Sequence, residues 1–120
     1  MSDLRNAVLN AVDIQTETVD VPEWEVKLEL RGMTGVERSA FTERTRSGDL
    51  SNEGVMAELL ISSAYDPESG ERVFEPADRD ILVTKNARVL DRLFRIAAML
   101  SGIGGGLEGK SETPPNSGGS

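Results

Sequence analysis

The chain has 120 residues, enough for one domain, and Leu, Ile, Val and Phe make up a quarter of them. It contains no cysteine and no histidine, which excludes disulfide bonds, Cys or His metal sites and catalytic mechanisms that need either side chain. The net charge of −8 disfavours nonspecific binding to nucleic acid or to anionic membranes. No apolar run is long enough to span a membrane and no signal-peptide pattern is present, so we expect a soluble intracellular protein.

Charge is unevenly distributed along the sequence. Residues 1–30 carry seven acidic side chains against Arg5 and Lys27. Residues 85–95 carry one acidic side chain and four basic ones: Lys85, Arg88, Arg92 and Arg95. This layout suits docking inside the domain or head-to-tail self-association, and an ordinary solvated helix face also explains it.

The first elements predicted are a helix and a pair of strands. Leu4, Val8 and Val12 recur every four residues, which predicts a helix over residues 2–12. From Trp24 to Arg31 apolar and charged residues alternate strictly, which predicts a strand with one buried and one solvated face. With the Thr- and Val-rich stretch before it, this strand forms a predicted pair over residues 18–31.

Two helices are predicted next, over residues 35–46 and 53–62. Thr34 and Glu37 have the spacing of a capping box at the start of the first helix. The apolar stripe expected to pack inward on that helix consists of Val36, Ala40 and Phe41. The second helix is expected to direct four apolar residues inward: Val55, Met56, Leu59 and Leu60.

A hairpin and two more helices complete the prediction. Residues 66–70 have the composition of a turn, and residues 64–65 and 73–74 are the expected arms of the hairpin. Pro76 suits the first position of a short helix reaching Val83, and the longest helix then runs to about Ser101. We therefore expect a small α+β fold, with an antiparallel sheet, four to five helices and a helical C-terminal half. The expected division is one domain over residues 1–101 and a disordered Gly/Ser/Pro-rich tail over residues 102–120.

One segment of the tail matches a phosphate-binding motif. Residues 104–111 satisfy the pattern G-x-x-x-x-G-K-[ST]. That motif needs a buried strand before it and a helix after it, whereas here a predicted helix precedes it and Pro114 and Pro115 follow. We therefore expect no nucleotide or other cofactor, no metal site and no catalytic residues.

The last helix carries an unusually wide apolar surface. Five residues share one face, namely Leu90, Leu93, Phe94, Ala97 and Leu100, and a second apolar stripe lies beside them. Together they cover about twice the arc of roughly 100° that a surface helix needs. The helix is therefore either enclosed within its own domain or keeps one stripe for another chain. Under the second interpretation the candidate partner-binding residues are Ile96, Met99 and Ile103, with the basic side chains Arg88, Arg92 and Arg95.

Four segments, taken in order, resemble the tail assembly chaperones of long-tailed bacteriophages, particularly of phages that infect actinobacteria. Residues 19–31 resemble the V-x-V-P-E-W opening strand of that family, although Glu25 stands where glycine is common. Residues 30–38 resemble its R-G-L-T-G-x-E-R junction. Residues 65–78 are similar to its hairpin segment, and residues 90–102 to its L-D-R-L-F and L-S-G closing helix.

The resemblance implies a protein that is not an enzyme. Members of the family bind and solubilise the tape measure protein during tail morphogenesis, help to recruit the major tail protein, and tend to self-associate. They act in the host cell cytoplasm and are not expected in the mature virion. Many also have a longer form made by ribosomal frameshifting. The alternative function is a structural virion component, such as a head–tail connector or a tail-terminator-like subunit, and an enzyme is the third.

Overall fold

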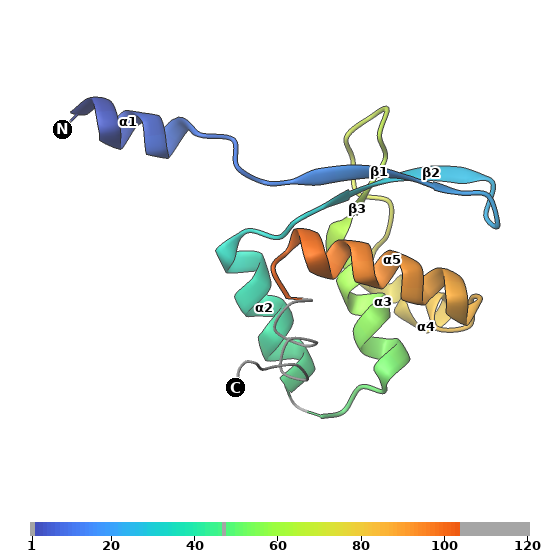
Figure 1. The fold of residues 1–120 in the computed structure, drawn as a ribbon. Coiled ribbons are helices and arrows are strands. Elements are labelled where there is room, and N and C mark those ends of the chain that lie inside the picture. The colour runs from blue at the N-terminus through green and yellow to red at the C-terminus, as the bar shows by residue number, and fades with distance from the viewer. Residues whose placement is uncertain (1, 47, 104–120) are drawn as a thin grey trace, which may run out of the picture.

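The structure is a computed structural model that describes residues 2–46 and 48–103. A three-stranded antiparallel sheet has the helices of the domain packed on one side of it (Figure 1). This arrangement confirms the predicted α+β class. The predicted tail lies outside the described residues, except for residues 102 and 103, and so does the phosphate-loop pattern over residues 104–111.

The sheet is built around one long hairpin. Strands β1 (Thr16–Val21) and β2 (Val26–Arg31) pair along their whole length, and β3 (Ala64–Tyr65) adds two residues to the other edge of β2. Alternate side chains enter the core because successive residues of a strand face opposite sides. The buried residues on the two long strands are Val19, Val21, Leu28 and Leu30.

Strand β2 begins two residues later in the chain than the alternation predicts, because residues 22–25 form a turn. Trp24 donates its amide to the carbonyl of Val21 at 3.0 Å, and Glu25 donates to Pro22 at 3.1 Å. Glu25 has a φ of 57°, so the backbone reverses at this residue instead of extending. The strand predicted from Trp24 therefore starts at Val26, and Trp24 packs against the core from the turn.

Helix α2 (Gly35–Arg46) starts with the predicted capping box. The Glu37 amide donates to Thr34 Oγ1 at 3.1 Å, and the Thr34 amide donates to Glu37 Oε1 at 2.9 Å. Phe41 is buried, but Val36 is 82% exposed and Ala40 is exposed, so the predicted inward stripe is wrong for these two residues. The reason is that α2 lies at the margin of the helical layer and buries only a narrow face (Figure 1).

Helix α3 (Asn52–Ser63) is the central helix of the domain. Ser51 caps its N-terminus by accepting a hydrogen bond from the Gly54 amide at 3.1 Å. Leu59 and Leu60 are fully buried, as predicted, and the helix leads directly into β3. The turn over residues 66–70 also forms as predicted, but the second arm of its hairpin is reduced to a single bridge between Tyr65 and Arg72.

The C-terminal half ends in three helical segments. These are a 3-10 turn, η1 (Pro76–Asp78), a short helix α4 (Arg79–Leu82) and the longest helix, α5 (Ala87–Leu100). Helix α5 lies between α3 and the sheet (Figure 1). Five of its residues are buried in the core: Val89, Leu90, Leu93, Ala97 and Ala98.

The N-terminal helix α1 (Ser2–Asn10) stands clear of the body (Figure 1). It ends two residues earlier than the periodicity predicts. Its apolar residues are exposed: Leu4 at 72%, Val8 at 64% and Leu9 at 62%. The helix therefore forms an arm that its own domain does not cover.

Candidate partner-binding surface on helix α5

Both ends of α5 are fixed by local hydrogen bonds. At the N-terminus, Asn86 Oδ1 accepts from the amides of Arg88 at 2.8 Å and Val89 at 3.2 Å. At the C-terminus, Gly102 has a φ of 75° and donates to the Met99 carbonyl at 3.1 Å. Ile103 then donates to Ala98 at 2.8 Å, which completes a Schellman motif. Both termini of α5 are therefore capped, which fixes where the helix begins and ends.

The wide apolar surface of α5 is used mainly within the domain. The helix contacts α3 on one side and β2 on the other, so two stripes meet the core. Ile96 and Ile103 are half-buried and pack against that core. Ile103 is held there because it follows the left-handed Gly102 in the Schellman motif.

Met99 is the apolar side chain of the candidate set that faces solvent, with 62% of its surface exposed. It follows Arg88, Arg92 and Arg95 at helical spacings of four, three and four residues, which places all four on the outer side of α5. We call these four residues the outer stripe. The structure therefore separates the six candidates into an exposed group, Arg88, Arg92, Arg95 and Met99, and a supporting pair, Ile96 and Ile103.

Two of the three arginines in the outer stripe are already paired. Arg92 donates from Nη2 and Nη1 to the two carboxylate oxygens of Glu23, at 2.9 and 3.1 Å. This interaction lowers the pKa of the Glu23 carboxyl from 4.5 to about 2 and raises the pKa of Arg92. Arg95 pairs with Asp91 one helical turn earlier. Within residues 2–46 and 48–103, Arg88 makes no ion pair, so its charge is the one most available to a partner.

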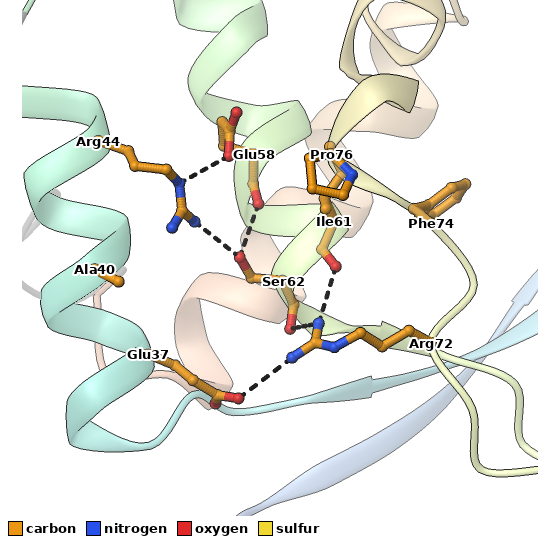
Figure 2. Close-up of a pocket in the computed structure, with 9 residues that line it drawn as sticks. All are labelled: Glu37, Ala40, Arg44, Glu58, Ile61, Ser62, Arg72, Phe74 and Pro76. Carbon is orange, nitrogen blue, oxygen red and sulfur yellow. Dashed lines mark hydrogen bonds and ion pairs between the residues drawn. The ribbon is translucent and has the colours of Figure 1, made fainter.

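A hollow of about 350 Å³ lies between α2, α3 and the segment that leads into η1 (Figure 2). Arg72 crosses its lower side, donating to the carbonyls of Ile61 and Ser62 at 3.3 and 3.1 Å and to Glu37 at 3.4 Å. On the opposite side Arg44 donates to Glu58 at 3.1 Å. These charged side chains use their hydrogen bonds on one another and on backbone carbonyls. The hollow therefore connects neighbouring elements of the fold and leaves few polar groups free for a ligand.

In the described part of the chain, no group of three or more acidic side chains is placed to hold a metal ion. No described helix is long and apolar enough to span a membrane.

Sequence reasoning missed two features beside the candidate surface. The first is Glu23, which pairs with Arg92 because the β1–β2 turn lies next to α5. Local sequence patterns do not predict such a contact between distant residues. The second is an apolar hollow next to Ile103, lined by Phe41, Val55 and Phe94 with Arg38 at its edge. The large apolar residues can be recognised in the sequence, but the sequence does not show that they lie around one hollow.

The sequence matches no known protein-family model and no curated protein. A comparison of folds gives a match to the solved structure of the bacteriophage HK97 tail assembly chaperone. The TM-score is 0.58 with 25% sequence identity, and the match covers 83% of this chain and 95% of that chain. The chain is therefore similar to a phage tail assembly chaperone over most of its length, and this similarity supports a role in phage tail assembly.

Proposed function

We propose that this protein is a tail assembly chaperone that binds the tape measure protein of a long-tailed phage and keeps it soluble until the tail forms. The main support is the fold match to the HK97 chaperone, which covers nearly all of that chain. The four sequence segments described above support the same family independently of the fold. Their pattern also favours a phage that infects an actinobacterium.

The outer stripe of α5 is the surface proposed to bind the tape measure protein. A chaperone of this kind must cover an exposed apolar face of its partner while keeping the complex soluble. Met99 supplies an adaptable apolar contact, and Arg88 supplies an unpaired charge within one helix face. The net charge of −8 on the whole chain would oppose aggregation of the complex.

Ile96 and Ile103 have a supporting role in this proposal. They are half-buried and fix the position of α5 against the core, so they define the shape beneath the outer stripe. Recruitment of the major tail protein would follow binding of the tape measure protein. The complex would form in the host cytoplasm, and the chaperone would be absent from the finished particle.

The proposal is tested by co-expression with the tape measure protein encoded in the same genome. Soluble tape measure protein that co-purifies with the wild-type chain would support it. The double variant Met99→Asp/Arg88→Glu should reduce the soluble yield, because it removes the exposed apolar contact and reverses the free charge. Val36→Asp is the matched control, since Val36 is 82% exposed on a different helix.

Two outcomes would contradict the proposal. The first is insoluble tape measure protein with the chaperone alone in solution, for both the short chain and any longer frameshifted form. The second is detection of this protein by mass spectrometry as a stoichiometric component of purified particles, which would favour a connector or tail-terminator-like subunit.

A further inference from the structure

Strand β1 forms an edge of the sheet that no other strand of the described chain covers. Strand β2 lies between β1 and β3, so one side of β1 pairs with β2 and its other side has no strand beside it. None of the backbone hydrogen bonds between described elements involves residues 16–20. Four of these five residues are exposed. An edge of this kind presents backbone donors and acceptors that can pair with another extended chain.

The register of the hairpin shows which residues of β1 face the outer edge. Gly32 donates its amide to the Gln15 carbonyl at 2.9 Å, so these two residues are a hydrogen-bonded pair. Hydrogen-bonded and non-hydrogen-bonded pairs alternate along an antiparallel ladder, and the pairing with β2 continues without interruption over residues 16–21. The residues of the non-hydrogen-bonded pairs direct their amides and carbonyls outward, and they are Thr16, Thr18 and Asp20.

Strand β1 lacks the features that most often block pairing at an edge. Those features are lysine, proline, a β-bulge or a covering element. The strand contains no lysine and no proline, since Pro22 comes after its last residue, and its register has no bulge. Three amides and three carbonyls therefore form a regular outer edge.

The acidic charge on this part of the chain determines which partner fits. Residues 13–26 contain five acidic side chains and no basic one. Glu17 lies on the inner face of β1 and Asp20 on the outer face, because successive residues of a strand alternate. Both are exposed, and neither makes an ion pair within residues 2–46 and 48–103. A strand beside β1 therefore meets one carboxylate on each of its two faces.

The cations of neighbouring elements balance this charge only in part. Lys27 is the cross-strand partner of Asp20, which also attracts Arg92 of α5, although Arg92 is already bound to the carboxylate of the β1–β2 turn. Arg31 pairs with a glutamate of its own strand. Glu17 has no cation opposite it, since its partner on β2 is a leucine. A strand that pairs with the outer edge of β1 must therefore bring cations of its own.

We infer that the outer edge of β1 binds an extended, basic segment of another protein, which adds to the sheet as a fourth, antiparallel strand. Backbone hydrogen bonds to Thr16, Thr18 and Asp20 hold the segment in place. One lysine or arginine opposite Glu17 and another opposite Asp20 select it. A second copy of this chain is a poor occupant, because pairing β1 with β1 brings two sets of carboxylates together.

A synthetic hexapeptide designed against this edge is the probe. Its sequence, Val-Lys-Val-Thr-Lys-Thr, begins opposite Val21 and runs antiparallel to β1, which places its lysines opposite Asp20 and Glu17. The peptide is blocked at both ends, labelled with a fluorophore and titrated with the full chain, and fluorescence anisotropy measures binding. The same peptide with glutamate in place of both lysines is the control and should bind about tenfold more weakly or less.

Methylation of the peptide backbone distinguishes strand pairing from attraction between charges. In the antiparallel arrangement, the peptide amides that face β1 are those opposite Thr16, Thr18 and Asp20. A methyl group on the amide opposite Thr18 should therefore abolish binding. A methyl group on the amide opposite Val19 points away from β1 and should leave binding unchanged. The two methylated peptides have the same composition and charge.

A substitution and an exchange measurement test the same edge on the protein. Thr18→Pro removes an outward amide that makes no bond to β2, so it should abolish probe binding and keep the hairpin, whereas Thr18→Val should bind as the wild type does. Hydrogen exchange measured by NMR needs no variant. The amides of Thr18 and Asp20 should exchange faster than those of Glu17 and Val19 in the chain alone, and should become protected when the probe binds.

Three results would overturn the inference. One is a wild-type chain that binds the lysine peptide no better than the glutamate peptide. Another is equal binding of the two methylated peptides, which would show attraction by charge without strand pairing. The third is protection of the Thr18 and Asp20 amides that rises with the concentration of the chain alone, which would assign the edge to a second copy. The probe needs no tape measure protein, so this inference and the proposed function can fail separately.

Discussion

The carboxylate of Glu23 accepts two hydrogen bonds from the guanidinium of Arg92, a residue 69 positions later in the chain. The pair joins the turn between β1 and β2 to the outer side of α5. The acidic N-terminal region and the basic last helix are therefore partly paired with each other within the domain. The side chains are 43% and 40% exposed, so the pair remains open to solvent and to salt.

The Glu23–Arg92 pair should contribute to stability in a pH-dependent way. The pKa of Glu23 is about 2 in the folded chain and 4.5 without the pairing. A carboxyl with a lowered folded pKa stabilises the fold fully above its unfolded pKa, and the contribution is lost as pH falls through the folded pKa. The difference in unfolding free energy between wild type and Glu23→Gln should therefore be constant above about pH 5 and shrink towards pH 2.

Urea unfolding at several pH values between neutral and acid measures this difference. Glu17→Gln is a suitable control, because Glu17 is an exposed carboxylate on β1 with no ion pair in the described residues. It should follow the wild-type acid dependence. A Glu23→Gln difference that stays constant down to pH 2 would show that the pair does not form in solution.

Gly32 lies where the backbone of two elements approaches closely. A Cβ atom at this position would collide with the carbonyl oxygen of Leu100, at the end of α5, and backbone cannot move aside as a flexible side chain can. Gly32→Ala should destabilise the fold by about 1–3 kcal/mol. Gly35→Ala is the matched substitution, because nothing lies within 4 Å of its added Cβ, and it should be neutral or stabilising by up to about 1 kcal/mol. Equal effects in chemical denaturation would contradict the close approach.

Glu25 is the described non-glycine residue with a positive φ, at 57°. An L-residue pays about 1–2 kcal/mol for the left-handed conformation, and glycine avoids that cost while losing more entropy on folding. Glu25→Gly should therefore leave stability unchanged or raise it by up to about 1 kcal/mol. Glu25→Val should lower it by more than about 1 kcal/mol, since a β-branched residue is especially unfavourable there. Thermal unfolding of the two variants side by side checks the turn, and a more stable Val variant would refute it.

Local patterns predicted the order and type of the elements well, because they record interactions over three or four residues. The capping box of Thr34 and Glu37 forms with both hydrogen bonds, and the alternation over residues 26–31 gives a strand with Leu28 and Leu30 buried. The same local information misplaced the start of that strand at Trp24. In the structure residues 22–25 form a turn instead, closed by hydrogen bonds from the Trp24 and Glu25 amides to the carbonyls of Val21 and Pro22.

What the sequence could not supply is the path of the chain through space. Val36 lies on the predicted apolar stripe of α2 but is exposed, since no other element of the domain covers that side. Ile103 was a candidate for partner contact, whereas the Schellman motif returns it to the core. The hollow beside Arg38 also combines residues from three helices. Each of these features depends on long-range packing, which periodicity within one element does not encode.

Glu58 is a buried carboxylate that joins three elements. It lies on α3 and pairs with Arg44 of α2 at 3.1 Å and with Arg79 of α4 at 2.9 Å, and only 10% of its side chain is exposed. Glu58→Gln keeps the shape but leaves two arginines facing a neutral amide, so it should cost about 2 kcal/mol of stability. Glu43→Gln breaks an exposed pair with Arg46 and should cost less than about 0.5 kcal/mol. Comparable losses in urea unfolding would contradict the distinction.

Met99 and Ile103 should respond differently to the same substitution, although both belong to the candidate surface. Met99 is 62% exposed, so Met99→Asp should change the free energy of unfolding by no more than about 0.5 kcal/mol. Ile103 packs against the core, and Ile103→Asp would place a charge there, so it should cost about 2 kcal/mol or more. Unfolding curves for the two variants, measured beside their co-purification with the tape measure protein, separate binding from stability. If Met99→Asp abolishes binding with a wild-type unfolding curve, the outer stripe is a contact surface. If it lowers stability as much as Ile103→Asp does, the side chain of Met99 is part of the core in solution and the stripe loses its apolar contact.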